Sequence, residues 1–464
     1  MRGASGLEGL RATIARYVAG RGLPKVWRTP DDAEIRRILL DWVESQRQSL
    51  GIVVGLVGPA GRRVLGHGVC AIDDTAPLDG RTVFEIGSVT KVFTALLLAD
   101  MACKGEVRLD QPVADLLSAT THVPARGRQI TLQDLATHTS ALPPLPTNFA
   151  PADAGNPYAD YTQQQLEAFL ADYALPYDIG RKHAYSNLGA GLLGHALARH
   201  VGTDYGSAIR TRICVPLGLE DTVIALSPEQ VARLAPGHDR ALEPTSNWDL
   251  PTLAGAGALR STADDMLTFL EQAMDLQPSP HRAAFDTLLT VRHLADGPME
   301  AALGWHVLRA GKREIVWHNG GTGGYRSFVG FDPTAKAGVV VLTNAANDAG
   351  CDDIGFHLLT GRPLAKLKPP ITRTTVRLGE AELAGLSGEY KFGGALTLYI
   401  TVEGSRVMAQ LTGQPEFEIY PESPTHFFWK VVDAQLTFER RPDGQATGVK
   451  LHQAGRILRA RRGA

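Results

Sequence analysis

The sequence predicts an α+β fold in which an antiparallel sheet is flanked by helices and followed by a small C-terminal antiparallel β-barrel. A strongly apolar, helix-like segment, VFTALLLADMAC, follows hairpin-like strands near the N-terminus. The stretch REIVWHNGGTGGYRSFVGFDPTAKAGVVVLTN, beginning at Arg313, is typical of consecutive strands joined by a turn at Asp332–Pro333. From Leu386 onward, short alternating segments at even spacing are typical of a small barrel.

Composition describes an ordinary soluble globular protein. The chain has 464 residues, of which 44% are hydrophobic and 21% charged, which is enough for two or three domains. A formal net charge of −2 argues against nucleic-acid binding and against attraction to anionic membranes. No apolar run approaches the roughly 18 residues of a membrane span. We therefore expect neither nucleic acid nor membrane as a partner.

The N-terminal stretch MRGASGLEGLRATIARYVAGRG lacks the uninterrupted apolar core of a secretory signal, and its apolar residues are spaced like one face of a helix. We expect a cytoplasmic protein, or a periplasmic or secreted one if this end is processed or altered.

Motifs for metals and cofactors are missing from the sequence. The four cysteines are far apart and fit neither a zinc spacing nor a redox C-x-x-C pair. The fourteen histidines include no H-E-x-x-H, and there is neither a P-loop nor a convincing G-x-G-x-x-G. The sequence therefore predicts no metal and no nucleotide cofactor.

Shifts in composition divide the chain into four segments. The stretch GRPLAKLKPPITRTT is poor in helix formers and holds three prolines, as a linker would. The predicted segments are an N-terminal helical extension (1–30), a main α+β domain (31–362), a linker (363–385) and the barrel (386–464).

The main domain opens with a predicted helix and a hairpin. Residues 31–49 carry apolar side chains at helical spacing, namely Ile35, Ile38, Leu39 and Trp42. Two short strands around the turn Pro59–Gly61 follow, and they lead into FEIGSVTKVF at residues 84–93.

Ser88 and Lys91 stand out in this last stretch. A helix is predicted from Ser88 to about Cys103, ended by Gly105, and residues three apart on a helix share a face. The helix is apolar nearly all round, as buried helices are. Burial disfavours the ammonium and lowers its pKa, which makes a neutral amine available as a base. The backbone N–H of Ser88, at the helix N-terminus, can face a developing oxyanion.

Two further stretches carry candidate site residues. Tyr185 and Asn187 straddle one residue just before an apolar helix, so both side chains can project from one loop. A neighbouring cation can lower the pKa of such a tyrosine, and asparagine offers a donor and an acceptor to a substrate amide. In HNGGTGGYRSFVGF, which begins at His318, the strand glycines indicate close approach of a ligand or another backbone.

Together these motifs resemble those of the serine β-lactamase and penicillin-binding-protein superfamily, in particular its class C-like branch. That branch includes D-aminopeptidases, D-Ala-D-Ala carboxypeptidases and family VIII carboxylesterases. The motif order S-x-x-K, Y-x-N and a K-T-G-like element is met by Ser88–Lys91, Tyr185–Asn187 and His318–Gly320. The segments LATHTSALP and GALRSTADDMLTFL also look like family landmarks, with Ala141 where glycine is more usual.

The resemblance covers about residues 35–360 and implies a β-lactamase/transpeptidase-like fold, while the C-terminal segment resembles the lipocalin-like barrel of some members. It implies that Ser88 forms an acyl-enzyme, that Lys91 and Tyr185 share the base role, and that Tyr185 passes the proton to the leaving group. The N–H groups of Ser88 and Gly321 would form the oxyanion hole, and Asn187 would orient the acyl-side amide.

One departure from the family pattern concerns substrates. His318, two residues before Gly320, stands where β-lactamases usually have lysine, and we expect this histidine to be charged only part of the time near neutral pH. This favours amide or ester substrates over β-lactams. No acidic residue clearly corresponds to the deacylating glutamate of class A enzymes, so the resemblance implies deacylation from the side of the site that holds Tyr185.

The resemblance thus predicts a serine hydrolase that cleaves an amide, peptide or ester bond of a small-molecule or peptide substrate. Two alternatives stay open. One is a penicillin-binding-protein-type peptide cyclase or acyltransferase, which passes the acyl group to an amine. The other is a non-catalytic covalent β-lactam sensor that is acylated and stalls.

Overall fold

The computed structural model describes residues 28–463 except 296, 311–312, 370–372, 394–395, 415, 431, 433 and 454–455. Residues 1–27 of the predicted helical extension therefore lie outside the described residues. The chain divides into two compact units, the larger ending at Pro370 and the smaller beginning at Ile371. In the part of the chain described, no helix is both long enough and apolar enough to cross a membrane.

The larger unit is built on a nine-stranded antiparallel sheet with the order β3-β2-β1-β11-β10-β9-β8-β7-β6. Its strands are β1 (Gly51–Gly58), β2 (Gly61–Ala71), β3 (Asp74–Pro77), β6 (His293–Leu294), β7 (Met299–Ala301), β8 (His306–Ala310), β9 (Arg313–Gly321), β10 (Arg326–Asp332) and β11 (Ala337–Thr343). A separate pair is formed by β4 (Phe84–Glu85) and β5 (Arg260–Ser261). The antiparallel α+β prediction is confirmed, as are the hairpin around Pro59–Gly61 and the consecutive strands from Arg313.

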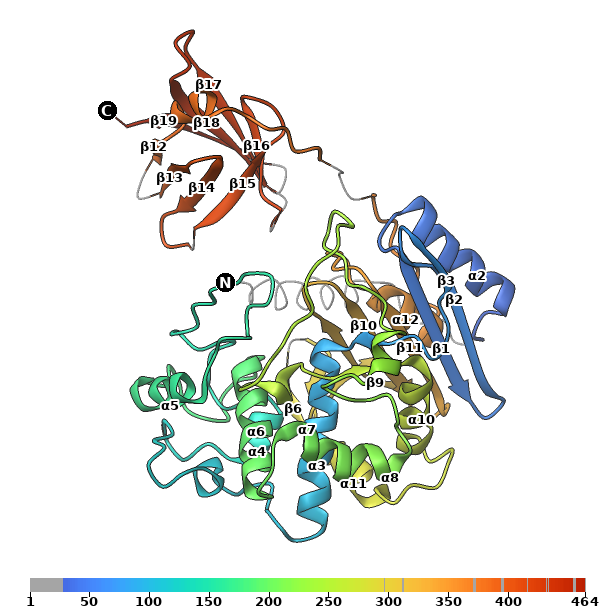
Figure 1. Ribbon diagram of the computed structural model, residues 1–464. Coiled ribbons are helices and arrows are strands. Elements are labelled where there is room, and N and C mark those ends of the chain that lie inside the picture. The colour runs from blue at the N-terminus through green and yellow to red at the C-terminus, as the bar shows by residue number, and fades with distance from the viewer. Residues whose placement is uncertain are drawn as a thin grey trace. The chain divides into compact units, whose positions relative to one another are not determined.

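Helices cover both faces of this sheet (Figure 1). The α-helices described in the larger unit are α2 (Asp32–Leu40), α3 (Thr90–Cys103), α4 (Leu132–Ala136), α5 (Gln163–Asp172), α6 (Asn187–His200), α7 (Tyr205–Ile209), α8 (Val215–Leu217), α9 (Pro228–Val231), α10 (Ala263–Ala273), α11 (Arg282–Leu288) and α12 (Asp352–Thr360). Short 3₁₀ and π turns complete the set: η1 (Asp41–Ser45), η2 (Gly87–Val89), η3 (Val113–Leu116), η4 (Arg210–Cys214) and η5 (Ala254–Ala256).

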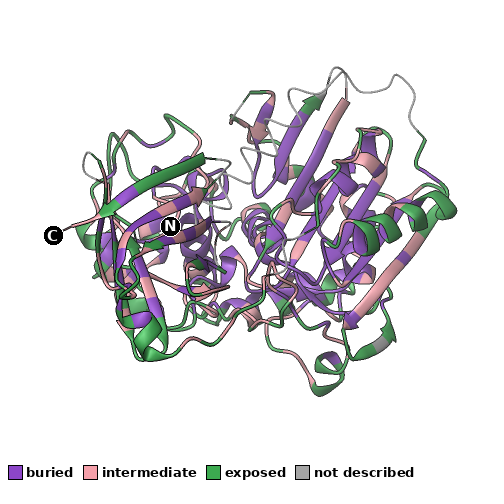
Figure 2. Ribbon diagram, turned by 90° about the horizontal axis from the view of Figure 1, so that it is seen from above, coloured by how far each residue is buried: buried purple, intermediate pink, exposed green. Residues whose placement is uncertain are grey.

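Strand β1 shows how the sheet sits between two apolar cores. Ile52 and Val54 join the core beneath α2 and α12, whereas Val53 and Val57 join the larger core that contains α3 and α10. Because successive side chains of a strand point to opposite faces, a strand buried on both sides reads as a continuous apolar run. Figure 2 shows the strands of the large sheet as mostly buried.

The helix predicted from Ser88 to about Cys103 is α3, which begins two residues later, at Thr90, because Ser88 lies in the preceding 3₁₀ turn η2. Twelve of its fourteen residues are buried, Lys91 among them. The chain turns out of the helix at Gly105, whose φ of +73° is a conformation that favours glycine. The apolar sequence of this helix thus corresponds to its position inside the larger core.

The smaller unit is a closed eight-stranded barrel, as predicted. Its strands are β12 (Gly388–Gly393), β13 (Leu396–Glu403), β14 (Arg406–Leu411), β15 (Phe417–Pro421), β16 (His426–Phe428), β17 (Ala434–Arg440), β18 (Ala446–Gln453) and β19 (Arg456–Arg462). A short helix, α13 (Glu380–Ala384), lies within the segment 363–385 predicted as a linker, and its Leu383 is buried in the barrel core. The alternating segments recognised in the sequence correspond to β13 through β19, and the stretch GEYKFG, which forms β12, was not among them.

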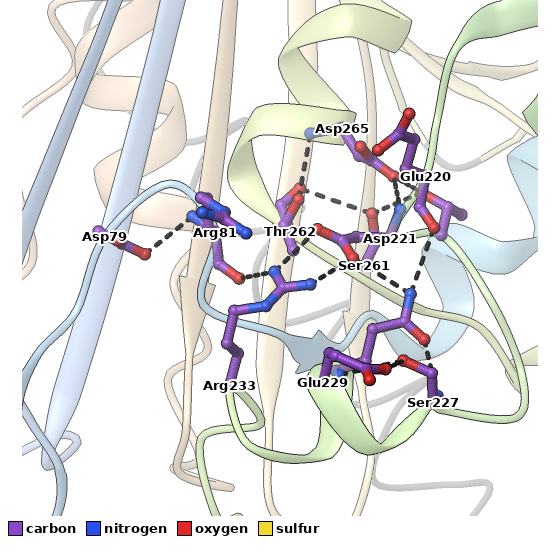
Figure 3. Close-up of polar contacts among 12 residues, drawn as sticks. Asp79, Arg81, Glu220, Asp221, Ser227, Glu229, Arg233, Ser261, Thr262 and Asp265 are labelled. Atoms are coloured by element: carbon purple, nitrogen blue, oxygen red, sulfur yellow. Dashed lines mark hydrogen bonds and ion pairs between the residues drawn. The ribbon is translucent and has the colours of Figure 1, made fainter.

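A cluster of hydrogen bonds and ion pairs connects the loops beside β5 and α10 in the larger unit (Figure 3). Arg233 donates to both carboxylate oxygens of Asp221, at 2.8 and 2.5 Å, and to the carbonyl oxygen of Arg81 at 2.6 Å. Asp265 accepts from the hydroxyl of Thr222 at 2.7 Å and from the backbone N–H of Asp221 at 2.8 Å. These bonds tie the start of α10 to the chain on either side of α9.

Candidate active site

Close backbone contacts place Ser88 at the end of strand β9. Gly87 has a φ of +49°, and a Cβ on it would lie 2.7 Å from the backbone nitrogen of Gly321. A Cβ on Gly320 would overlap the carbonyl oxygen of Ile86. Glycine is therefore required on both sides of this contact. The contact brings the backbone beside Ser88 next to Gly321, as an oxyanion hole formed by these two residues requires.

Lys91 lies beneath Ser88 with its side chain buried. Its Nζ lies 2.9 Å from Ser88 Oγ, 2.8 Å from Asn187 Oδ1 and 2.6 Å from the carbonyl oxygen of Ala256. Among the described residues, no carboxylate pairs with it within salt-bridge distance. Burial lowers the pKa of the ammonium well below its ordinary value, as the sequence predicts.

Tyr185 is hydrogen-bonded to Ser88. Lys91 Nζ is 4.9 Å from the centre of the tyrosine ring. The expectation that a neighbouring cation lowers the pKa of Tyr185 is wrong in direction, because burial raises this pKa above its ordinary value, and the hydrogen bond with Ser88 opposes the shift only in part. The phenol therefore carries its proton when no substrate is bound.

Asn187 is the first residue of α6, a helix capped by the side chain of Ser186, which accepts from Gly189 N–H at 2.8 Å. Its Oδ1 accepts from Lys91, and its Nδ2 donates to the hydroxyl of Tyr158 at 3.3 Å. Burial raises the pKa of Tyr158 to about 12. Tyr158 was not among the predicted site residues.

His318 is 1% exposed and lies with its ring 6.3 Å from that of Tyr185. Its Nδ1 is 2.6 Å from the carbonyl oxygen of Asn319, which can only accept, so Nδ1 carries the proton of the neutral ring. Burial, and then the nearby Lys91, lower the pKa of His318 to about 3. The expectation of a part-time charge near neutral pH is therefore wrong, because the side chain is too deeply buried to be protonated there.

The structure thus brings all seven predicted site residues together: Ser88, Lys91, Tyr185, Asn187, His318, Gly320 and Gly321. It adds groups that sequence reasoning missed. The ring of His306 stacks on that of His318 at 4.7 Å, and the ring of His138 lies 4.4 Å from that of Tyr185. His138 belongs to the landmark LATHTSALP, which was the only signal for it. Among the described residues, no group of three or more His, Cys, Asp or Glu side chains is arranged to hold a metal ion.

Comparison with known proteins agrees with this geometry. The family described as Beta-lactamase matches residues 10–361, and a domain of unknown function (DUF3471) matches residues 372–461. A β-lactamase of Lysobacter lactamgenus is 27% identical over 381 residues, which are 73% of this chain and 94% of the relative. The D-alanyl-D-alanine-carboxypeptidase/endopeptidase AmpH of Escherichia coli (strain K12) is 32% identical over 308 residues, which are 61% of this chain and 78% of the relative.

A solved structure supports the same assignment. The class C β-lactamase from Rhodobacter sphaeroides matches with a TM-score of 0.60 at 27% sequence identity, over 68% of this chain and 95% of that chain. Since the family match spans residues 10–361 and the fold is that of a class C enzyme, the chain belongs to the β-lactamase family and is a serine hydrolase.

Proposed function

We propose that the protein hydrolyses an amide, peptide or ester bond through an acyl-enzyme on Ser88. The hydrogen bonds of Lys91 carry this proposal. A neutral amine has two N–H bonds and one lone pair. The side-chain oxygen Oδ1 of Asn187 and the backbone carbonyl oxygen of Ala256 can only accept hydrogen bonds. They therefore accept from the two N–H groups, at 2.8 and 2.6 Å. The lone pair is then left for the hydroxyl proton of Ser88, 2.9 Å away.

Acylation follows from this arrangement. The Ser88 proton passes to Lys91 Nζ while Oγ bonds to the substrate carbonyl carbon. The N–H groups of Ser88 and Gly321 stabilise the resulting oxyanion, and a donor of this kind contributes about 3 to 4 kcal/mol in the transition state. When the tetrahedral intermediate collapses, the scissile C–N or C–O bond breaks. The leaving atom takes the hydroxyl proton of Tyr185, which the proton held by Lys91 replaces.

Deacylation uses the same groups in reverse. Water attacks the Ser88 ester while its proton passes through Tyr185 to Lys91. The C–Oγ bond then breaks, and the proton returns to Ser88 Oγ as the carboxylic acid leaves. The raised pKa of Tyr185 suits a group that gives and regains a proton within one step, with neutral Lys91 as the base at rest.

The substrate class follows from the charge beside Ser88. Neutral His318 presents no permanent positive charge where β-lactamases usually have lysine. We therefore favour neutral acyl amides and esters over substrates that need a carboxylate bound at this position. The relative named as a D-alanyl-D-alanine-carboxypeptidase/endopeptidase makes a peptide containing D-residues a suitable first amide to test.

Intact-mass analysis tests the proposal. The protein is exposed to a p-nitrophenyl ester, a D-amino-acid amide and a penicillin, and the adduct and product are followed over time. A transient adduct with turnover supports the hydrolase. A persistent adduct favours the sensor, and a product joined to an added amine favours the acyltransferase.

Two serine variants complete the test. Ser88→Ala should form no adduct, while Ser405→Ala, at an exposed serine in the β13–β14 turn, should behave like the wild type. A wild-type rate in Ser88→Ala would overturn the mechanism in every version.

A further inference from the structure

We propose that His138 is a positioning residue that holds Tyr185 against Ser88, and this inference rests on the proposed function. His138 contacts the loop of Tyr185 on both sides of that residue. Its carbonyl oxygen accepts from Ala184 N–H at 2.8 Å, and its Nδ1 accepts from Ser186 N–H at 3.2 Å. Its ring packs on the ring of Tyr185 at 4.4 Å. The residues before and after Tyr185 are therefore both bonded to the same residue.

The neighbours of His138 extend this hold to Asn187. The carbonyl oxygen of Pro143 accepts from Ser186 Oγ at 2.6 Å. The carbonyl oxygen of Pro144 accepts from the backbone N–H of Asn187 at 3.1 Å. Residues 138–144, here called the clamp segment, thus bind the backbone or side chain of each residue from 184 to 187 except Tyr185 itself. Tyr185 keeps its hydroxyl free for Ser88 because its neighbours supply the bonds that fix the loop.

The backbone of the clamp segment is held in an uncommon conformation. His138 has a φ of +58° and Ala141 a φ of +64°, in the left-handed region that non-glycine residues rarely adopt. Such conformations persist where the surroundings determine them, and they cluster at active sites. Two of them within four residues, beside a catalytic loop, indicate that the clamp segment is shaped for its position.

The start of the clamp segment is anchored to a buried carboxylate. Thr139 donates through its backbone N–H to the carbonyl oxygen of Asp134 at 2.9 Å, and its hydroxyl donates to Asp134 Oδ1 at 3.2 Å. Asp134 is also paired with Arg128 through both terminal guanidinium nitrogens. The segment that carries His138 is therefore itself held in place by hydrogen bonds.

Side-chain chemistry explains why histidine suits this position. Nδ1 accepts from Ser186, so the proton of the neutral ring is on Nε2. The side chain is 5% exposed, and burial keeps the ring neutral, with Nδ1 free to accept. Asparagine offers an acceptor, Oδ1, at the same number of bonds from the backbone and tolerates positive φ. It lacks the ring that packs on Tyr185 and carries an NH2 group in place of the ring N–H.

Three variants of His138 test the proposal with p-nitrophenyl acetate as the probe, and the acylation rate constant is resolved from KM by burst kinetics. His138→Ala removes the acceptor and should slow acylation about 100-fold, the loss expected from a small misplacement of a catalytic group, with KM nearly unchanged. His138→Asn restores the acceptor and should remain within about fivefold of the wild type. His200→Ala, at the exposed end of α6, is the matched control and should acylate normally.

Melting temperature and near-UV circular dichroism establish that each variant is folded. If His138→Ala does not fold, His138→Gln decides, because its acceptor lies one methylene farther out and should give the same loss of acylation. Wild-type acylation in a folded His138→Ala or His138→Gln would overturn the proposal. Equal losses in folded His138→Asn and His138→Ala would also overturn it. Failure of the proposed function is recognised separately, by an active Ser88→Ala.

Discussion

Two polar clusters in the larger unit hold cationic side chains in opposite surroundings, Lys91 fully buried and Arg233 only partly. Lys91 meets three neutral oxygen atoms, and burial lowers the pKa of its ammonium well below the ordinary value. Arg233 meets the carboxylate of Asp221 (Figure 3), and this hydrogen-bonded pairing raises the pKa of Arg233 and lowers that of Asp221. Pairing fixes a charge for structure, whereas burial without a counter-charge makes a side chain ready to exchange a proton.

Asp265 illustrates the same rule inside the second cluster. It accepts hydrogen bonds from Thr222 and from the backbone of Asp221, but among the described residues no cation pairs with it. Burial raises the pKa of its carboxyl to about 6. Hydrogen bonds alone therefore do not fully offset the cost of burying a charge, so the pKa of Asp265 moves toward the neutral form, as that of Lys91 does.

The most severe test of this comparison replaces Lys91. Lys91→Met removes the base and Lys91→Arg keeps a charge that cannot be released, so both should slow acylation about 1,000-fold. Burst kinetics with an activated ester would measure the loss. If Lys91→Arg acylated within about tenfold of the wild type, a fixed charge rather than a neutral amine would be the requirement.

The opposite result is expected at the second cluster. Arg233→Met leaves the Asp221 carboxylate without its counter-charge and should lower the free energy of unfolding by about 1 to 3 kcal/mol, because the pair is only partly exposed. Urea unfolding would measure this loss, and acylation by the folded variant should be unchanged. The double variant Arg233→Met/Asp221→Asn should regain part of the stability. Slower acylation in folded Arg233→Met would contradict the claim that Arg233 serves stability and not catalysis.

Backbone strain beside the active site offers a smaller effect. Ala141 has a φ of +64°, so Ala141→Gly should relieve a cost of about 1 to 2 kcal/mol, while the greater freedom of glycine in the unfolded chain costs about 0.5 to 1 kcal/mol. We expect a net stabilisation of about 0.5 kcal/mol by denaturant unfolding. Ala136→Gly, within helix α4, should instead destabilise the protein. Equal losses in both variants would contradict the strain at Ala141.

The smallest expected effect is the absence of a pH change. His318 has a pKa of about 3, so its ring becomes protonated only as the pH falls toward that value. The shape of the kcat/KM profile between about pH 5 and 9 should therefore be the same in wild type and His318→Gln, whatever the plateau. A limb near the ordinary histidine pKa that vanished in His318→Gln would show that His318 titrates there.

Much of this architecture was predictable because it depends on local pattern. The apolar helix carrying Lys91 and the alternating strands β13 and β14 follow directly from side-chain periodicity. Strand β12, with the sequence GEYKFG, was missed because Tyr390 is its only fully buried side chain. An alternation with a single buried member gives no recognisable period.

The surroundings of the site residues were not predictable in the same way. Ala256 reaches Lys91 through its backbone carbonyl oxygen, which every residue possesses, and His138 reaches Tyr185 from 47 positions away by a ring contact. Neither contact leaves a trace in spacing or composition. The pKa values of Tyr185 and His318 depend on the depth of burial, so their directions could be assigned only once the tertiary structure was known.

The position of β1 in the middle of the large sheet affects when this sheet can fold during synthesis. Ile52 in β1 pairs with Thr343 in β11, so two neighbouring strands in the middle of the large sheet come from opposite ends of the sequence of this unit. On the ribosome, the sheet cannot close until the chain has been synthesised past Thr343, and contacts this distant in sequence form slowly. Each barrel strand after β12, in contrast, pairs with its immediate predecessor, so the barrel can fold by successive hairpins. The large sheet is therefore completed only late in synthesis. Until β11 is available, one edge of strand β1 stays unpaired.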